Sequence, residues 1–176
     1  MEIPVGLKFH KDEIQRQAAA AGLDVYLVAA VVWQESGFNT DAFRHEPNFW
    51  NRYLKQNAKY RHLNPRRVSS SYGLMQVMYP LVHEDDLLDN DSLPPEHLFV
   101  PEFGLRSGCG NLVKCIRWAT ANGAGCSPDR IVEAALAAYN GGRSSDNRPT
   151  TPVLRNGRYA REVDQKLRIL KAAQAF

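Results

Sequence analysis

Glu35 is a carboxylate at the end of an otherwise apolar segment, and this position favours acid/base chemistry. The residues from Val25 to Trp33 are almost all apolar, so the helix predicted from Val25 to about Ser36 is central in the fold. Gly37 ends that helix and places Glu35 in its last turn. Apolar surroundings and the negative end of the helix dipole should raise its pKa above the ~4.3 of a free glutamate. A carboxyl group protonated near neutral pH is a general acid, whereas a glutamate facing solvent is the alternative that this position allows.

The other reactive residue types do not form a recognisable site. The five histidines lack the H-E-x-x-H spacing of zinc enzymes, and the three cysteines contain no C-x-x-C pair. Cys109 is expected on a buried helix stripe, and Cys115 with Cys126 could at most close a short disulfide. Gly108 and Gly110 are an isolated fragment inside a predicted helix and not a phosphate-binding loop. The sequence therefore predicts no metal site and no cofactor.

The elements that position these residues are mostly helical. Helix-forming periodicity, N-caps and terminal glycines predict further helices over 11–21, 48–57, 72–79, 104–122, 128–139 and 159–170. The acidic stretch after Pro80, through Pro95, and the connection from Gly141 to Gly157 are predicted loops. Strand signals are almost absent. We therefore expect a mainly α fold.

Length and composition place the chain among ordinary globular proteins. Its 176 residues, 44% hydrophobic and 23% charged, suit a single domain over 1–176 with a real core. The longest apolar stretch, Leu23 to Trp33, is much shorter than the roughly 18–20 residues of a membrane span, so none is expected. The N-terminus has no apolar h-region, so we expect no signal peptide.

Charge is unevenly distributed along the chain. Seven Lys and Arg residues against one acid lie between Arg44 and Arg67, whereas Leu81 to Glu102 carries seven acids and no Lys or Arg. We expect the basic segment to help hold an anionic polymer, with a solvated surface as the alternative. The basic excess is small and no nucleic-acid-binding module is recognisable, so no nucleic-acid partner is expected.

Four motifs resemble those of a known family. Glu35-Ser36-Gly37-Phe38-Asn39, Ser71 to Val77 (SYGLMQV), Ala137 to Gly142 (AAYNGG) and Tyr159 to Val163 (YAREV) occur in the order and character of the soluble lytic transglycosylases. This is the SLT type, which is related to goose-type lysozyme. Each motif alone is weak, but four in the right order make coincidence improbable. The resemblance implies a lysozyme-like single domain.

The resemblance also implies roles for particular residues. Glu35 aligns with the single catalytic acid/base. The implied substrate-binding residues are Ser36, Met75, Gln76, Tyr139, Asn140 and Tyr159, of which Tyr159 matches a tyrosine with its hydroxyl near the catalytic glutamate. Met75 and Tyr139 would equally suit the core. The segment from about 46 to 68 is longer than the common pattern and is interpreted as a basic insertion.

The reaction implied is cleavage of the β-1,4 bond between N-acetylmuramic acid and N-acetylglucosamine in peptidoglycan strands, with 1,6-anhydro ends. The acids from Glu84 to Asp91 fall in a predicted loop, and none is assigned as a nucleophile. Two alternatives remain at this stage: a hydrolytic lysozyme on the same fold, and a wall-binding or phage structural module without activity. The protein is expected to act at the bacterial wall or periplasm, either exported and processed or delivered by a phage particle or secretion apparatus.

Overall fold

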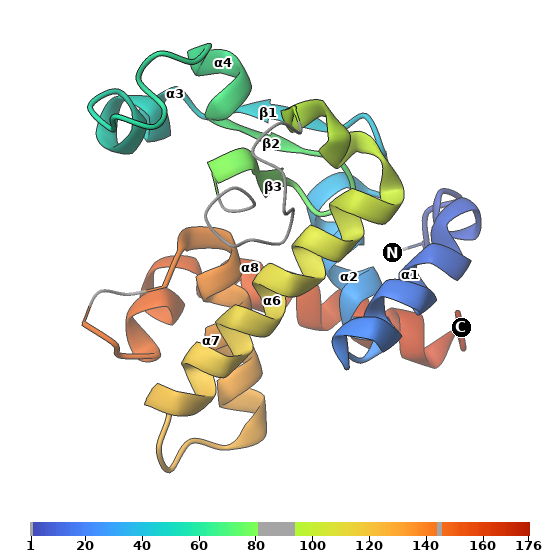
Figure 1. The fold of residues 1–176 in the computed structure, drawn as a ribbon. Coiled ribbons are helices and arrows are strands. Elements are labelled where there is room, and N and C mark those ends of the chain that lie inside the picture. Colours follow the sequence, from blue (N-terminus) through green and yellow to red (C-terminus); the bar gives the residue numbers. More distant parts are fainter. Residues whose placement is uncertain (1, 81–93, 144–145) are drawn as a thin grey trace.

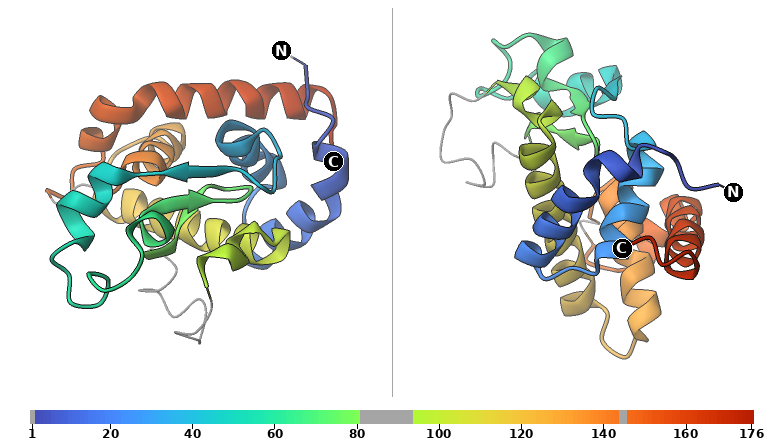
Figure 2. Two further views of the ribbon diagram at one scale, coloured as in Figure 1. Left: turned by 90° about the horizontal axis from the view of Figure 1, so that it is seen from above. Right: turned by 90° about the vertical axis from the view of Figure 1, so that its right-hand side faces the viewer.

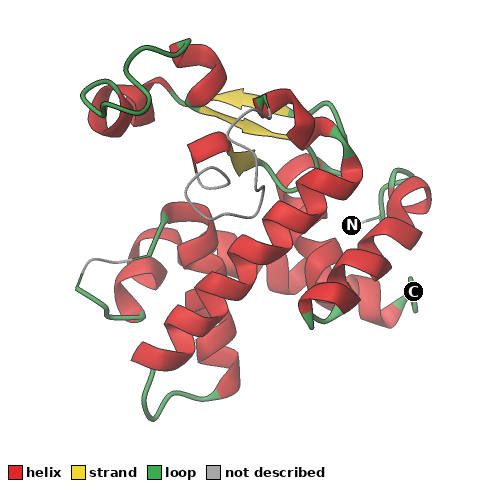
Figure 3. Ribbon diagram, in the orientation of Figure 1, coloured by secondary structure: helices red, strands yellow, loops and turns green. Residues whose placement is uncertain are grey.

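The computed structural model describes residues 2–80, 94–143 and 146–176, and it is mainly helical with one small sheet (Figures 1 and 3). The long helices are α1 (Leu7–Ala21), α2 (Val25–Ser36), α6 (Pro101–Asn122), α7 (Pro128–Gly141) and α8 (Thr150–Ala172). The short helices are α3 (Pro47–Phe49), η1 (Trp50–Leu54), α4 (Pro65–Val68) and η2 (Pro95–Phe99). The strands are β1 (Phe43–His45), β2 (Ser70–Tyr72) and β3 (Val77–Met78). The expectation of a mainly α fold is confirmed.

Helix α2 is the centre of the core, as its apolar sequence predicted. Residues 28–32 are completely buried, and α2 packs against both α1 and α8. Asp24 caps the helix by accepting a hydrogen bond from the Tyr26 amide at 2.8 Å. Gly37 ends it in the left-handed conformation, with φ of 60°. These caps fix where α2 stops, and so they fix the position of Glu35.

The remaining long helices enclose α2, and the sheet lies at one side (Figure 2). Helix α6 packs against α1 and α7, and α7 packs in turn against α8. The helix predicted over 104–122 is confirmed with an earlier start at Pro101, and that over 128–139 is confirmed through Gly141. No helix among the described residues is both long enough and apolar enough to cross a bilayer.

The predicted helix over 72–79 is wrong. The segment instead contains the end of β2, a turn, and β3, in an antiparallel sheet of order β1-β2-β3 that pairs Phe43 with Tyr72 and Tyr72 with Val77. Gly73 and Gln76 adopt positive φ values of 68° and 46°, which no α-helix contains. Strand β1 pairs with β2 far along the chain, whereas β2 and β3 pair across the short turn at residues 73–76, and strands of two or three residues are too short to show a periodicity of their own.

Other boundaries also differ from the sequence predictions, and helix α1 begins at Leu7 rather than at the predicted residue 11. Helix α8 begins at Thr150, inside the connection expected to run to Gly157, because the chain is already helical before a kink at Asn156. The peripheral helix predicted over 48–57 is shorter, and its second part, η1, is a π-helix. Of the loop predicted after Pro80, residues 81–93 lie outside the described residues, while Pro95–Phe99 form a 3-10 helix.

The 46–68 segment packs around a small cluster of its own. Leu54, Tyr60 and Val68 are buried together with Tyr79, and Phe49 and Trp50 pack against them. The amide of Glu46 donates to the Ser69 carbonyl at 2.8 Å and closes the base of the segment. That the 46–68 segment is an insertion stays a prediction. The domain bounds of 1–176 also stay a prediction.

Helix α6 approaches the turn before β3 closely enough to require a glycine. A Cβ at Gly108 would lie 2.6 Å from Cβ and 2.4 Å from Sδ of Met75. We therefore expect Gly108→Ala to reduce the free energy of unfolding by about 1–3 kcal/mol, the usual cost of overpacking a core. Urea denaturation measures this change. Gly157→Ala, in a helix where the new Cβ would meet side chains at 3.3 Å or more, should be nearly neutral, and equal effects of the two variants would contradict the close contact.

Candidate active site

Glu35 is held in a mostly buried position with one edge at a cleft. Burial is the largest effect and raises the pKa of its carboxyl to about 7, as the sequence argument predicted in direction. Tyr159 of α8 donates a hydrogen bond from its hydroxyl to Oε1 of Glu35 at 2.6 Å. This contact stabilises the carboxylate and lowers the pKa of Glu35. At neutral pH the carboxyl is therefore divided between its protonated and ionised forms, which is the condition for both giving and taking a proton.

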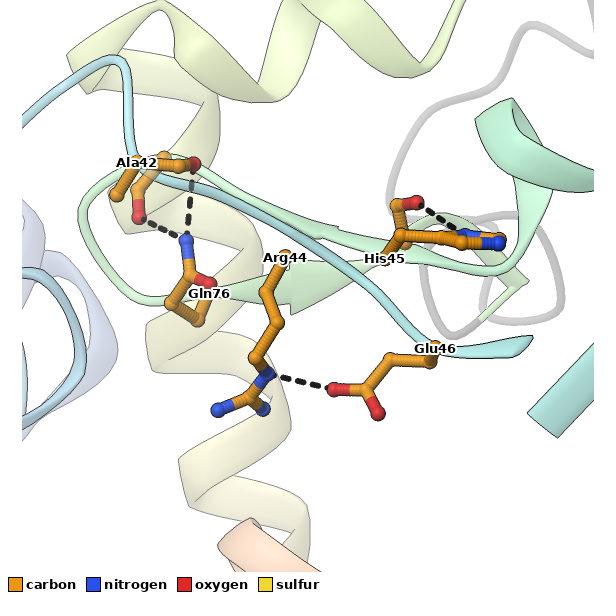
Figure 4. A network of polar contacts seen from close by, with 7 residues as sticks. Ala42, Arg44, His45, Glu46 and Gln76 are labelled. Atoms are coloured by element: carbon orange, nitrogen blue, oxygen red, sulfur yellow. Dashed lines mark hydrogen bonds and ion pairs between the residues drawn. The ribbon is translucent and has the colours of Figure 1, made fainter. Parts of the chain in front are cut away.

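Arg44 places a positive charge in the same cleft. It projects from β1, and its Nε donates to Oε1 of Glu46 at 2.6 Å, which orients the guanidinium (Figure 4). Its charge also lowers the pKa of Glu35, and this effect is smaller than those of burial and of the Tyr159 hydrogen bond. Both Arg44 and Glu35 line the cleft. Arg44 therefore favours the ionised form of Glu35.

The turn between β2 and β3 forms the cleft wall and is fixed by hydrogen bonds. The side-chain amide of Gln76 donates to the carbonyls of Ala42 at 2.9 Å and Gly73 at 3.1 Å (Figure 4). The hydroxyl of Ser36 donates to the Leu74 carbonyl at 2.8 Å and thereby joins the end of α2 to the same turn. Of these residues, Gln76 lines the cleft.

Tyr139 and Met75 connect α7 to this turn. The Tyr139 hydroxyl donates to the Met75 carbonyl at 2.8 Å, and burial followed by the nearby Glu35 charge keeps its pKa well above the usual value. The Met75 side chain is completely buried against Gly108 and does not line the cleft. Its position suits a supporting residue under the cleft, and its predicted contact with glycan stays a prediction.

The structure brings four of the seven predicted site residues to the cleft, whereas Ser36, Met75 and Tyr159 do not line it. Asn140 lines the cleft with Glu35, Gln76 and Tyr139. Arg44, Ser71 and Asn111 also line it, and sequence reasoning did not single them out as site residues. Arg44 lies on β1, a three-residue strand without a visible alternation, and Asn111 lies within α6, where the apolar stripe is the dominant pattern. The sequence signal for Asn111 is a polar residue directly before Leu112, which belongs to that apolar stripe.

Glu35 is the one carboxylate among the described residues that line the cleft. The acids from Glu84 to Asp91 fall outside the described residues. Within the described part of the chain, no group of three or more histidine, cysteine or acidic side chains is placed to hold a metal ion. The arrangement therefore suits chemistry carried out by one acid/base group.

The three cysteines are free thiols. Cys109 and Cys115 are buried in two different apolar clusters, and burial raises their pKa values to about 12 and about 11. Cys126 is exposed. Thiols that remain protonated are poor nucleophiles, so the buried cysteines behave as small apolar residues.

Comparison with known families agrees with this geometry. The profile of the transglycosylase SLT domain matches residues 12–153, which is most of the chain. The chain belongs to the transglycosylase SLT domain family. No curated protein matches it significantly. Membership assigns the SLT domain, at the level of the family, to peptidoglycan cleavage of the lytic transglycosylase type and to action on the cell wall. The fold is the mainly α, lysozyme-like single domain that the resemblance implied. Tyr159 lies beyond the matched residues, yet it contacts Glu35.

Replacing Arg44 tests the electrostatics of the SLT site directly. Its positive charge favours the ionised carboxyl, so Arg44→Gln should raise the pKa of Glu35 above its value of about 7. NMR titration of the carboxyl carbon measures the shift. Arg66→Gln removes an equal charge from a residue stacked on Phe43, outside the lining of the cleft, and is the control. An unchanged or lowered pKa in Arg44→Gln would show that the guanidinium does not act on Glu35.

Proposed function

We propose that this protein is a lytic transglycosylase in which Glu35 is the single acid/base. The bond cleaved is the β-1,4 linkage between N-acetylmuramic acid and N-acetylglucosamine. The observation that carries the proposal is the mostly buried carboxyl of Glu35, whose pKa of about 7 allows both protonation states near neutral pH. The family match supports the substrate class.

The first step is proton donation to the leaving sugar. Oε1 of Glu35 accepts the hydrogen bond from Tyr159, so Oε2 is the oxygen that carries the transferable proton. Transfer of this proton to the glycosidic oxygen breaks the bond to C1 of the muramoyl residue and leaves positive charge on that ring. The 4-hydroxyl of N-acetylglucosamine is the leaving group. Glu35 is then a carboxylate, which the Tyr159 hydroxyl and the charge of Arg44 stabilise.

The second step returns the proton to Glu35. The carboxylate removes the proton from the muramoyl C6 hydroxyl while that oxygen bonds to C1. The product is a 1,6-anhydro ring, Glu35 is protonated again, and no water is consumed. This scheme differs from the two-carboxylate mechanism of most glycosidases and accords with a cleft in which Glu35 is the one carboxylate among the described lining residues.

The substrate contacts divide into those that face the glycan and those that support the cleft. Gln76, Asn140 and the exposed part of Tyr139 line the cleft and are proposed to contact the sugars. Ser36 and Met75 are proposed to act through the backbone of the turn that they hold in place. Tyr159 is proposed to orient the carboxyl and to stabilise its ionised form.

The tests below distinguish two alternative functions from the proposed one. A hydrolytic lysozyme would use water in place of the C6 hydroxyl. A wall-binding or phage structural module would leave glycan intact. A buried acid with a raised pKa has no purpose in binding alone, because its burial disfavours the charged form and so lowers stability at alkaline pH.

Removing the acid should abolish release of soluble muropeptides from purified peptidoglycan. Glu35→Gln keeps the volume of the side chain but cannot give or recover a proton. General acid/base assistance typically contributes about 10²–10⁴ in rate, so release should fall by at least that factor.

The amide should not impair folding. Because it removes the burial of a charge, Glu35→Gln should be at least as stable as the parent at pH 8 in urea denaturation. Glu133→Gln, an equivalent change on α7 at a residue paired with Arg130 and absent from the cleft lining, should retain full activity. A folded Glu35→Gln protein with near-parental release would remove Glu35 from the proposed role.

Product analysis separates ring closure from hydrolysis. The C6 hydroxyl is part of the reacting sugar, and a well-oriented intramolecular group has an effective concentration of ~10⁵ M or more, so ring closure should outcompete water. Products should carry 1,6-anhydromuramoyl ends that are one water lighter than hydrolysed ends and resist borohydride reduction. Digestion in ¹⁸O-water should leave them unlabelled by mass spectrometry. Reducible, ¹⁸O-labelled muramic acid as the main product would identify a lysozyme.

A further inference from the structure

We propose that five residues of α3 and η1 form a second glycan-binding surface, the distal platform, which holds the peptidoglycan strand beyond the catalytic cleft. Its residues are Asn48, Phe49, Asn51, Arg52 and Tyr53, and they line one shallow surface pocket. The inference rests on the proposed function for the identity of the strand, and it assigns a separate site to it.

The platform exposes aromatic rings in an arrangement that suits a sugar. The rings of Phe49 and Tyr53 lie with their centroids 5.0 Å apart at an angle of 49°, and Tyr53 is 56% exposed. The flat face of a pyranose presents C–H groups, which pack well on the negative face of an aromatic ring. Phe49 is partly covered by the core of the segment, so Tyr53 provides most of the accessible ring surface.

Polar groups of the right kind surround these rings. Asn48 and Asn51 are exposed amides, each able to donate to and accept from sugar hydroxyls and N-acetyl groups. The Arg52 guanidinium lies 5.9 Å from the centroid of the Tyr53 ring. Guanidinium groups bind carboxylates with two parallel hydrogen bonds, and the peptide stems of peptidoglycan carry carboxylates. Rings, amides and a cation together match an N-acetylated glycan with anionic stems.

The platform is supported by a fixed base. The segment packs around its own buried cluster, which contains Leu54 at the end of η1. At its other end, Arg67 forms two hydrogen bonds of 2.7 Å to the carboxylate of Glu96 in η2. A surface held in place before binding loses less conformational entropy when a ligand arrives.

The platform follows closely in the chain on the strand that lines the cleft. Helix α3 begins at Pro47, two residues after β1 ends, and β1 contributes Arg44 to the cleft lining. The ribbon views place α3 and the first turns of α8 at the same end of the molecule (Figures 1 and 2). Leu154, on those first turns, is 86% exposed. In this proposal, a strand leaves the cleft at this end and passes the platform.

The charge of the segment complements this ligand. Between Arg44 and Arg67 the chain carries seven Lys and Arg residues against one acid. Peptide stems make peptidoglycan anionic, so the field of the segment attracts a strand and retains it after each cleavage. An anionic polymer without sugar rings would bind to the cations of the segment but would gain no affinity from Tyr53.

The test measures binding in the full chain carrying Glu35→Gln, so that strands stay intact. Glycan strands of eight disaccharides and of two disaccharides, each with and without peptide stems, are titrated by calorimetry. Adding Tyr53→Ala should weaken binding of the long strands about threefold to tenfold, the range of an ordinary aromatic contact, and leave the short ones unchanged. Adding Arg52→Gln should weaken only the long strands that carry stems.

The chain offers a matched control for each change. Phe9 on α1 is 72% exposed, and the Nζ of Lys8 lies 4.8 Å from its ring centroid. Phe9→Ala and Lys8→Gln therefore remove an exposed ring and a neighbouring cation away from the platform, and they should not change binding. The proposal is overturned if Tyr53→Ala binds long strands as tightly as Phe9→Ala does. It is also overturned if Tyr53→Ala weakens the binding of short and long strands by the same factor.

Failure of the platform and failure of the proposed function give different results. With Glu35 intact, cleavage of short and long strands that is indifferent to Tyr53 would overturn the platform and leave the transglycosylase standing. Length-dependent binding through Tyr53 without any cleavage would keep the platform and overturn the reaction. Binding of duplex DNA with the same dependence on Tyr53 would assign the surface to nucleic acid and overturn the glycan proposal.

Discussion

The burial of one carboxyl group at the edge of a cleft is the constraint on which the rest of the site depends. Glu35 is buried deeply enough for its pKa to reach about 7, and its surroundings also contain partners for the ionised form. Tyr159 supplies a hydroxyl at 2.6 Å and Arg44 supplies a positive charge, so the carboxyl is close to balance between two states. Each contribution comes from a different element: the end of α2, helix α8 and strand β1.

That balance depends on a turn whose backbone is held from several sides. Ser36, Tyr139 and Gln76 all use their side chains on backbone carbonyls of the turn or of the segment that precedes β1. Beneath it, Gly108 allows the backbone of α6 to approach Met75. This geometry therefore depends on particular polar and small residues, of which Ser36, Met75 and Gly108 do not line the cleft.

The sequence analysis succeeded where the determinants are local. Asp24 and Gly37 delimit α2 through capping, which is visible in consecutive residues, and the apolar run before Glu35 indicates the partial burial that raises its pKa. The sheet was not predicted, since strands of two or three residues are too short for a visible alternation and β1 has its partner far along the chain. Because β1 was not predicted, the position of Arg44 at the cleft was not predicted either. The contact of Tyr159 with Glu35 was expected only through the family resemblance, because no local pattern relates residues 124 positions apart.

The same separation has a consequence for the biosynthesis of the protein. Ribosomes make the chain from its N-terminus, so α2 is complete long before the final 23-residue helix that carries Tyr159 has emerged. Until that helix docks, Glu35 lacks its hydroxyl partner and part of the cover that makes it an acid at neutral pH. Contacts between such distant segments form late, because their loop-closure entropy must be overcome first. A nascent or truncated chain without α8 therefore lacks the hydroxyl partner of Glu35, and the cleft reaches its full set of contacts only with the last step of folding.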